Sequence, residues 1–268
     1  MPGSGQPIHR NRDVAESFGV DAERYDRTRP RYPEALVNRI LSASPGVDLL
    51  DVGCGTGIAA RQFQAAGCKV VGVEPDPRMA DFARRSGVEV EVSRFEDWDA
   101  AGRSFDAVVA GTAWHWVDPR AGAVKAGRVL RTHGRLAPFH HVFQVPLVIA
   151  EAMGDAYRQV MPESAVDLGA MLTKPALDVY RPLFDTIADG IRNAAVFAEP
   201  EEWRFDWEHT YSRDEWIDQL PTFGGLSALN DHQLVEMRSA TASAIDRFGG
   251  HVTVSYSTVV VTATRHSA

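Results

Sequence analysis

Short apolar runs alternate with amphipathic stretches through the first half of the chain. The runs at 47–52, 69–74, 88–93 and 105–110 have the length and composition of buried strands. The stretches between them carry apolar residues at helical spacing, and Gly67 closes the first of these helices. Strands that alternate with helices in this way predict a parallel sheet with helices on both faces.

The pattern changes after His141. A helix is expected over 118–134, stopped by Gly134, and a strand over 135–140. Beyond it, 142–198 has helical patterns with no strand between them, which predicts a helical insertion that acts as a lid. The remainder predicts three elements: a strand at 203–211, a helix at 231–248, and a long strand or hairpin at 251–266.

These elements predict an α/β fold: a doubly wound, Rossmann-like, mostly parallel seven-stranded sheet with an antiparallel final strand and a helical insertion. Ligand sites in such sheets lie at the carboxyl ends of the strands. We expect four segments, namely an N-terminal tail and helical cap, a ligand-binding core, the insertion or substrate lid, and the C-terminal part of the core sheet, at 1–45, 46–141, 142–198 and 199–268.

Composition and charge narrow the possible partners. The chain has 268 residues, of which 44% are hydrophobic and 24% charged, as in ordinary globular proteins. A formal net charge of −8 argues against nucleic acid as the main partner. The sequence shows no membrane span and no signal peptide. Two cysteines suit a reducing cytoplasm, and the nine scattered histidines form no metal motif.

Three glycines directly follow the first apolar run. Gly53, Gly55 and Gly57 form G-x-G-x-G between a predicted strand and a predicted helix, where backbone N–H groups and the helix dipole face a ligand. Dinucleotide-binding loops need G-x-G-x-x-G, and no Gly-Lys-Ser/Thr follows for a nucleotide-phosphate loop. A purely structural tight turn is the other interpretation.

Two acidic residues favour a ligand without phosphate. Asp51 precedes the glycines, where a carboxylate would repel a pyrophosphate and attract a positively charged group. Glu74 ends the next strand, 21 positions after Gly53, which is the distance typical of a carboxylate that binds ribose hydroxyls.

At these residues the sequence resembles a known family. "LLDVGCGTG" and "VVGVEPDPRM" are similar to the first two motifs of the class I S-adenosylmethionine-dependent methyltransferases. "YDRTRPRYP" (25–33) and "AWHWVD" (113–118) resemble the trans-aconitate-methyltransferase-like branch of the methyltransferase type 11 group. The resemblance covers roughly residues 20–140, and it implies that the core at 46–141 binds S-adenosylmethionine and releases S-adenosylhomocysteine.

The resemblance also implies which residues bind the methyl donor. In such proteins the first strand's acid and the glycine backbone hold the methionine part, the second strand's acid holds the ribose, and residues after the third and fourth strands flank the adenine and the methionine part. In this sequence these positions are Asp51, Gly53, Gly55, Gly57, Glu74, Phe95, Glu96, Thr112 and Ala113. Arg94 stands where the family often has an acid, so the adenine contact shifts to Glu96, Asp97 or a backbone carbonyl.

Several further residues could serve the acceptor. His115 is the candidate general base, or a structural histidine that shapes the pocket. His140 and His141 follow the fifth strand at the same rim, and Arg29 could hold a carboxylate of either substrate. An aromatic wall is the interpretation of four more residues, Tyr25, Tyr32, Trp114 and Trp116.

The sequence thus predicts a cytoplasmic methyltransferase that acts on a small molecule, with a hydroxyl or carboxylate oxygen as acceptor. A non-catalytic S-adenosylmethionine-binding protein and a nicotinamide-dependent oxidoreductase are the alternatives. The absence of an Asn/Asp-Pro-Pro-Tyr/Phe motif disfavours methylation of nucleic-acid amino groups. A monomer and a homodimer both stay open.

Overall fold

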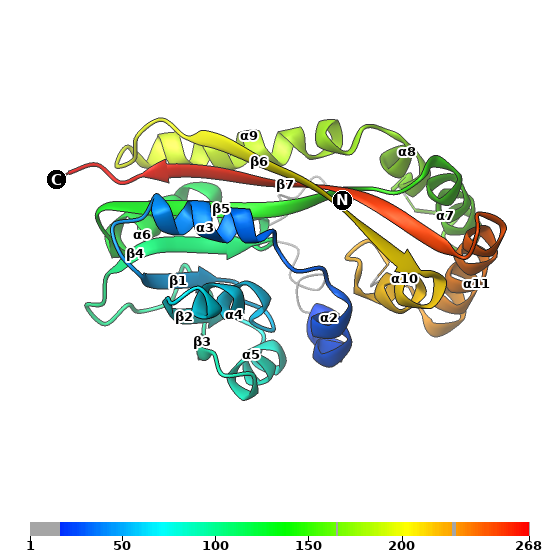
Figure 1. Ribbon diagram of the computed structural model, residues 1–268, viewed down its shortest axis with the longest axis horizontal. Coiled ribbons are helices and arrows are strands. Elements are labelled where there is room, and N and C mark those ends of the chain that lie inside the picture. The colour runs from blue at the N-terminus through cyan, green and yellow to red at the C-terminus, as the bar shows by residue number, and fades with distance from the viewer. Residues whose placement is uncertain (1–16, 165, 227–228, 268) are drawn as a thin grey trace. The chain divides into compact units, whose positions relative to one another are not determined.

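A single seven-stranded sheet organises the described part of the chain. The computed structural model describes residues 17–164, 166–226 and 229–267, so the predicted tail at 1–16 lies outside the described residues. The strands follow the order β3-β2-β1-β4-β5-β7-β6, and β7 lies between β5 and β6 (Figure 1). Their bounds are β1 Asp48–Val52, β2 Lys69–Glu74, β3 Glu89–Val92, β4 Phe105–Gly111, β5 Leu130–Gln144, β6 Glu201–Ser212 and β7 His251–Thr264.

The predicted fold class is confirmed. The pairs β1–β2, β1–β4, β2–β3 and β4–β5 are parallel, and the final strands are antiparallel. The order reverses between β1 and β4, so the carboxyl ends of these two strands meet at the switch point where doubly wound folds bind ligands.

The helices begin where the sequence supplies caps. Asp76 and Asp118 each accept hydrogen bonds from backbone N–H groups of the following helix, and a proline occupies the first turn of both helices. The helices are α2 Ala22–Thr28, α3 Glu34–Ser42, α4 Ile58–Ala65, α5 Pro77–Arg85, α6 Pro119–Val129, α7 Leu147–Val160, α8 Leu168–Thr173, α9 Ala176–Ala194, α10 Arg213–Gln219 and α11 Asp231–Arg247. Short 3₁₀ turns cover Phe18–Asp21, Trp114–Trp116 and Leu220–Thr222.

The chain divides into two compact units. We call residues 30–141, 182–205 and 258–267 the sheet unit, and residues 17–29, 142–181 and 206–257 the helical unit. Each unit gathers segments that are distant in sequence, so the units are bounded differently from the four predicted segments, whose roles stay predictions.

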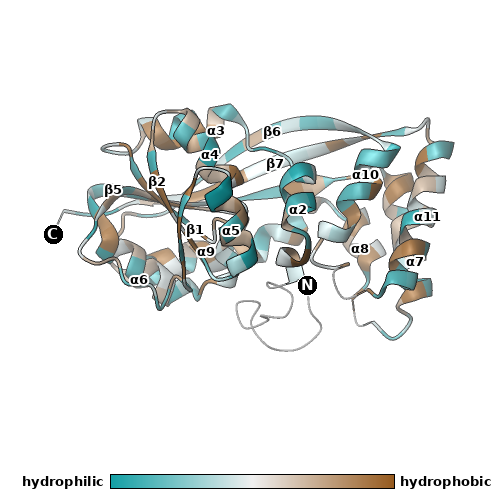
Figure 2. Ribbon diagram, turned by 90° about the horizontal axis from the view of Figure 1, so that it is seen from below, coloured by the Kyte–Doolittle hydropathy of each residue, from teal (hydrophilic) through white to brown (hydrophobic). Residues whose placement is uncertain are grey.

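Each unit has a hydrophobic core of its own. In the sheet unit, Leu36, Ile40 and Phe63 from the helices pack with Leu49 and Val109 from the sheet. In the helical unit, buried apolar residues of α7 and α11 belong to one cluster, and Figure 2 shows hydrophobic residues along both helices. The core of this unit includes Ile149, Trp216, Met237 and Ile245, all fully or almost fully buried.

One predicted helix extends too far. α6 ends at Val129, and Leu130, which is 1% exposed, begins β5 by pairing with Phe105 of β4. Gly134 lies inside this strand instead of stopping a helix, and a Cβ there would approach Arg131 O at 2.8 Å. The strand ladder overrides the helical pattern because both partners become buried in the sheet. Residues 251–264 form one strand, so the hairpin alternative is wrong.

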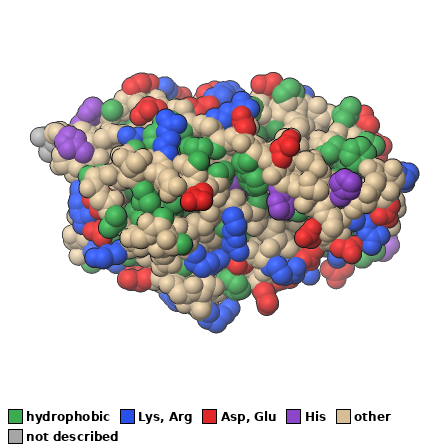
Figure 3. All heavy atoms as spheres, viewed as in Figure 1, with side chains coloured by type: hydrophobic (Ala, Val, Ile, Leu, Met, Phe, Trp, Pro, Cys, Tyr) green, Lys and Arg blue, Asp and Glu red, His purple; other side chains and the backbone are tan. Residues whose placement is uncertain are grey.

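Charged side chains of both signs cover the exposed surface. On the face seen in Figure 3, acidic side chains are interspersed with basic ones. Several form pairs one helical turn apart, among them Arg84–Asp81 and Arg192–Asp189. The helices of the described residues include none that is long and apolar enough to cross a membrane.

Candidate functional site

The glycine turn between β1 and α4 requires glycine for two reasons. Gly53, Gly55 and Gly57 have φ values of 64°, 56° and 86°, in the region that favours glycine. Gly53 also lies against the segment after β4, because a Cβ at this position would be 2.7 Å from Ala113 Cβ. The Gly53 N–H donates to Val73 O at 2.8 Å, which ties the turn to β2.

The Asp51 carboxylate is buried beside this turn without a hydrogen-bond partner of normal geometry among the described residues. Its side chain is 1% exposed, and both oxygens are enclosed. Burial, and then the nearby Glu74, raise the pKa of Asp51 to about 8, while the backbone N–H of Ala60 acts in the opposite direction. A buried carboxylate in this state is costly to ionise unless a cation approaches it.

Glu74 is fixed in place by two backbone N–H groups. Gly55 N donates to Oε2 at 2.8 Å, and Asp76 N donates to Oε1 at 2.9 Å. Burial raises the pKa of Glu74 to about 7, although both hydrogen bonds favour its ionised form. Each oxygen keeps a further lone pair, so the carboxylate can still accept hydrogen bonds from a ligand.

The residues after β3 are held by the start of α6. The Phe95 ring is buried and lies 6.0 Å from the Trp114 ring. One oxygen of the Glu96 carboxylate accepts a hydrogen bond from Asp118 N at 3.0 Å, and Lys125 Nζ donates to Glu96 O at 2.9 Å. These contacts fix the segment that the resemblance assigns to the adenine.

Thr112, directly after β4, has a strained backbone. Its φ is 54°, which is rare for a β-branched residue and marks a position where the surroundings enforce the conformation. Thr112 N donates to Phe139 O at 2.7 Å, and its hydroxyl lies 3.1 Å from the Tyr32 hydroxyl. Tyr32 is itself anchored, because its backbone N and O pair with the Gln62 amide at 2.9 and 2.8 Å.

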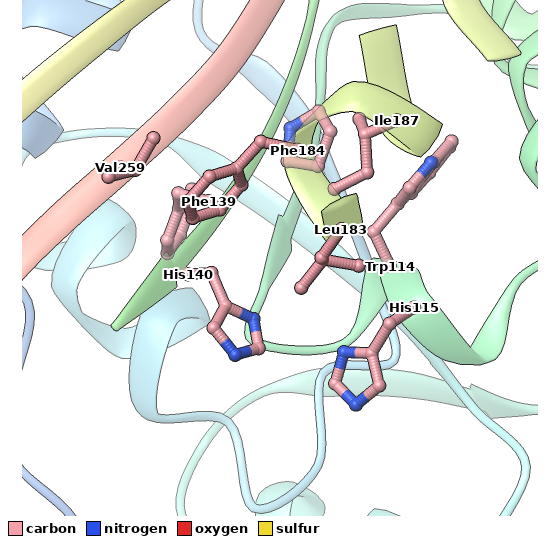
Figure 4. A pocket seen from close by; sticks show the side chains of 9 residues that line it. Trp114, His115, Phe139, His140, Leu183, Phe184, Ile187 and Val259 are labelled. Atoms are coloured by element: carbon pink, nitrogen blue, oxygen red, sulfur yellow. The ribbon is translucent and has the colours of Figure 1, made fainter. Parts of the chain in front are cut away.

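A small hollow lies at the carboxyl ends of β4 and β5. His115 and His140 point into it side by side, with their rings 5.2 Å apart (Figure 4). The hollow has room for about one water molecule. It is lined by Trp114, His115, Pro138, Phe139, His140, Leu183, Phe184, Ile187 and Val259, all in the sheet unit.

His115 is neutral near neutral pH. Its Nδ1 is buried and makes no hydrogen bond to a described residue. Burial lowers the pKa of His115 to about 4. The ring can therefore accept a hydrogen bond there, whereas its protonation would cost free energy.

The structure separates the other predicted acceptor residues into two groups. His141 does not line the hollow; its ring stacks on Tyr32 at 4.3 Å, and Nδ1 lies 2.9 Å from Thr258 Oγ1. Trp116 lies beside His115, at 4.5 Å between ring centroids. Tyr25 and Arg29 belong to the helical unit instead.

Sequence reasoning missed the side of the hollow that α9 supplies. Leu183, Phe184 and Ile187 come from this helix, and Val259 comes from β7. Their helical and strand periodicity was visible, but a periodic pattern does not show which distant element an apolar face covers. The described residues contain no group of three or more His, Cys, Asp or Glu side chains that could hold a metal ion.

Comparisons with known proteins place the glycine turn in a recognised domain. Residues 50–137 match the family model described as a methyltransferase domain. An uncharacterized methyltransferase of Mycobacterium tuberculosis is 37% identical over 127 residues, which is 47% of this chain and 52% of that protein. A malonyl-[acyl-carrier protein] O-methyltransferase of Hahella chejuensis is 33% identical over 133 residues, which is 46% of this chain and 47% of that protein.

A solved structure agrees with the fold over nearly the whole chain. A protein of Anaeromyxobacter dehalogenans described as a type II methyltransferase has a TM-score of 0.62 and 24% identity, covering 90% of this chain and 99% of that one. The chain spans about half the length of the curated relatives it matches. The trans-aconitate branch stays a prediction. Residues 50–137 thus match a methyltransferase domain of the S-adenosylmethionine-dependent class.

Proposed function

We propose that the protein transfers a methyl group from S-adenosylmethionine to an oxygen of a small-molecule acceptor. The unpartnered Asp51 carboxylate, buried beside the glycine turn, carries this proposal. A charged group in such surroundings is stable only when an opposite charge accompanies it. S-adenosylmethionine is cationic at its ammonium and sulfonium groups and has no phosphate, so it suits this position.

Different residues of the site would bind different parts of the methyl donor. Asp51 and the N–H groups of the turn at Gly53, Gly55 and Gly57 would bind the methionine part, and Glu74 would accept hydrogen bonds from the ribose hydroxyls. The remaining contacts, to the adenine and to the methionine part, would come from Phe95, Glu96, Thr112 and Ala113. The donor, when bound, supplies an electrophilic methyl group, and the protein contributes orientation and the exclusion of water.

The chemistry of His115 supports an oxygen acceptor. A neutral His115 can accept a hydrogen bond from an acceptor hydroxyl and so orient its oxygen. The low pKa of His115 makes orientation a better role for it than storage of a proton. A carboxylate acceptor would need no base at all. One relative is named as an O-methyltransferase, which also favours oxygen.

Calorimetry with S-adenosylhomocysteine tests the donor site. Asp51→Asn keeps the size of the side chain but removes the charge, and we expect a loss of at least about thirtyfold in affinity, since an unpaired charge in a binding site costs about 2 kcal/mol or more. Asp185→Asn, an exposed change on α9, is the control and should bind as the unaltered protein does. Equal affinity in Asp51→Asn would remove the basis of the proposal.

Transfer of a labelled methyl group tests the reaction. Incubation with labelled S-adenosylmethionine and two acceptor panels, hydroxy compounds and carboxylic acids, should give an ether or an ester. Label found on nitrogen or carbon would contradict the oxygen assignment. Tight binding of S-adenosylhomocysteine without transfer to any panel member would favour the non-catalytic alternative.

A further inference from the structure

Arg29 of the helical unit is a cation without an anionic partner. Its guanidinium carbon lies 5.0 Å from the Tyr25 ring centre and 5.2 Å from that of Phe223. Nη2 donates to Thr222 O at 2.5 Å, whereas Nε is buried and makes no hydrogen bond to a described residue. The guanidinium thus lies against aromatic rings with part of its donor edge unused.

The neighbouring arginines Arg24 and Arg27 differ from Arg29 because each has an anionic partner. Arg24 and Arg27 both pair with Asp218 of α10. Arg29 forms no ion pair with any carboxylate among the described residues, although Asp218 lies in the same unit. In this segment the charges of Arg24 and Arg27 are therefore compensated by a carboxylate, whereas the charge of Arg29 is not.

Three phenols and two buried polar side chains belong to the same unit as Arg29. Burial raises the pKa of Tyr180, Tyr211 and Tyr256, and the positive charge of Arg29 opposes the rise in each case, so all three phenols lie within its field. Gln219 and Trp216 are 1% and 0% exposed, and neither Gln219 Oε1 nor Trp216 Nε1 makes a hydrogen bond of normal geometry to a described residue.

Tyr25, Arg29 and Phe223 are each partly exposed, so this cluster extends to the surface of the helical unit. The surrounding surface is aromatic: Phe143 stacks on Phe223 at 5.5 Å, and Trp216 lies 5.6 Å from Phe223. An anion that enters here would meet a charged fork, and the part of the molecule attached to it would meet ring faces.

We propose that Arg29 and the aromatic residues around it bind the carboxylate of an acceptor whose body is aromatic or acyl. The inference deepens the proposed function by naming the substrate class. It rests on the proposed function only in identifying the bound carboxylate compound as the methyl acceptor. The planar guanidinium would donate from Nε and a second nitrogen to the two carboxylate oxygens. Tyr25 and Phe223 would hold the guanidinium in place during binding.

Thermal unfolding of the full chain with benzoate and with benzamide tests the site. These probes have nearly the same shape, but only benzoate is charged. We expect benzoate at tens of millimolar to raise the unfolding temperature by a few degrees, and benzamide to leave it unchanged. Absence of a shift with benzoate, or an equal shift with benzamide, overturns the proposal.

Variants locate the effect and separate the two possible carboxylates. Arg29→Gln should lose the benzoate shift and Arg29→Lys should retain only part of it, whereas Arg27→Gln, the matched control, should keep it. Arg29→Gln should still bind S-adenosylhomocysteine within about twofold of the unaltered protein, which also shows that it folds. A tenfold weaker affinity would mean that Arg29 binds the donor's own carboxylate, and would overturn the assignment to the acceptor.

The same measurements distinguish this proposal from the proposed function. Asp51→Asn should lose S-adenosylhomocysteine binding and keep the benzoate shift. If the unaltered protein bound benzoate but not S-adenosylhomocysteine, the methyltransferase proposal would fail and the carboxylate site would stand.

Discussion

Each unit holds an ionisable side chain that forms no ion pair with a described residue: the buried Asp51 in the sheet unit and the half-buried Arg29 in the helical unit. In the sheet unit, Asp51 lies at the end of a buried strand, next to a turn whose glycines follow within six residues. In the helical unit, Arg29 contacts the ring of Tyr25 in α2 and the ring of Phe223, which directly follows the 3₁₀ turn at Leu220–Thr222.

The difference lies in how each site is built. Asp51 depends on a short continuous stretch of chain, so the local sequence already defines the charge and the backbone around it. Arg29 depends on segments almost two hundred positions apart, for instance Thr222. The Asp51 site therefore follows from the local sequence, whereas the Arg29 site follows from the tertiary fold.

The pH dependence of donor binding should give the largest effect. Because Asp51 has a pKa of about 8 and a cationic ligand binds its ionised form, binding below that pH must release a proton. The affinity for S-adenosylhomocysteine should rise roughly fiftyfold from pH 6 to pH 8. Calorimetry in two buffers with different ionisation heats measures the released proton. Asp51→Asn should lose this part of the dependence, and a flat profile in the unaltered protein would contradict the idea of an unneutralised anion.

The free energy of unfolding of the ligand-free protein should fall as pH rises, whereas the affinity for the donor should rise. The pKa of Asp51 is raised above its unfolded value of 3.8, so the native state holds the extra proton between about pH 4 and pH 8 and loses stability as pH rises through that window. Asp51→Asn should therefore unfold at a higher temperature at pH 9, by a few degrees for about 1–2 kcal/mol, and be nearly neutral at pH 5. Destabilisation at pH 9 would show that the carboxylate has a partner in the native state.

The sequence predicted the sheet unit better than the helical unit for the same reason. The run 49–57 fixes a strand, a turn and a carboxylate by nearest-neighbour rules, and Glu74 follows from the next strand. The surroundings of Arg29 depend on where α10 and β7 pack, which periodicity does not report. α10 itself begins at a capping box of Ser212 and Glu215 that is visible in the sequence, yet it was not predicted.

Long-range contacts also account for the errors within the sheet unit. The helix expected over 118–134 stops at Val129 because Leu130 pairs with Phe105, a contact over 25 positions. His140 and His141 are adjacent in sequence, but alternation along β5 turns them to opposite sides: His140 lines the hollow and His141 stacks on Tyr32. A shared rim was predicted for both, and the structure places only His140 there.

The smallest expected effect comes from a change at Tyr32. This change tests whether the local sequence alone is sufficient to hold the donor site. Tyr32→Phe removes only the hydroxyl near Thr112, and a hydrogen bond of this kind contributes about 1 kcal/mol. We expect S-adenosylhomocysteine affinity to fall by up to about fivefold. Tyr157→Phe is the control, since it loses a comparable contact to Ser164 in the helical unit and should not affect binding. An unchanged affinity in Tyr32→Phe would mean that the local chain is sufficient.

The position of β7 has a consequence for how the molecule is made. This strand lies between β5 and β6, and its residues 251–257 belong to the helical unit while 258–264 belong to the sheet unit. During synthesis, β5 and β6 leave the ribosome well before their common neighbour. The seven-stranded sheet stays incomplete until residue 264 has emerged, so the nascent chain must keep the edges of β5 and β6 that β7 later covers from aggregating in the interval.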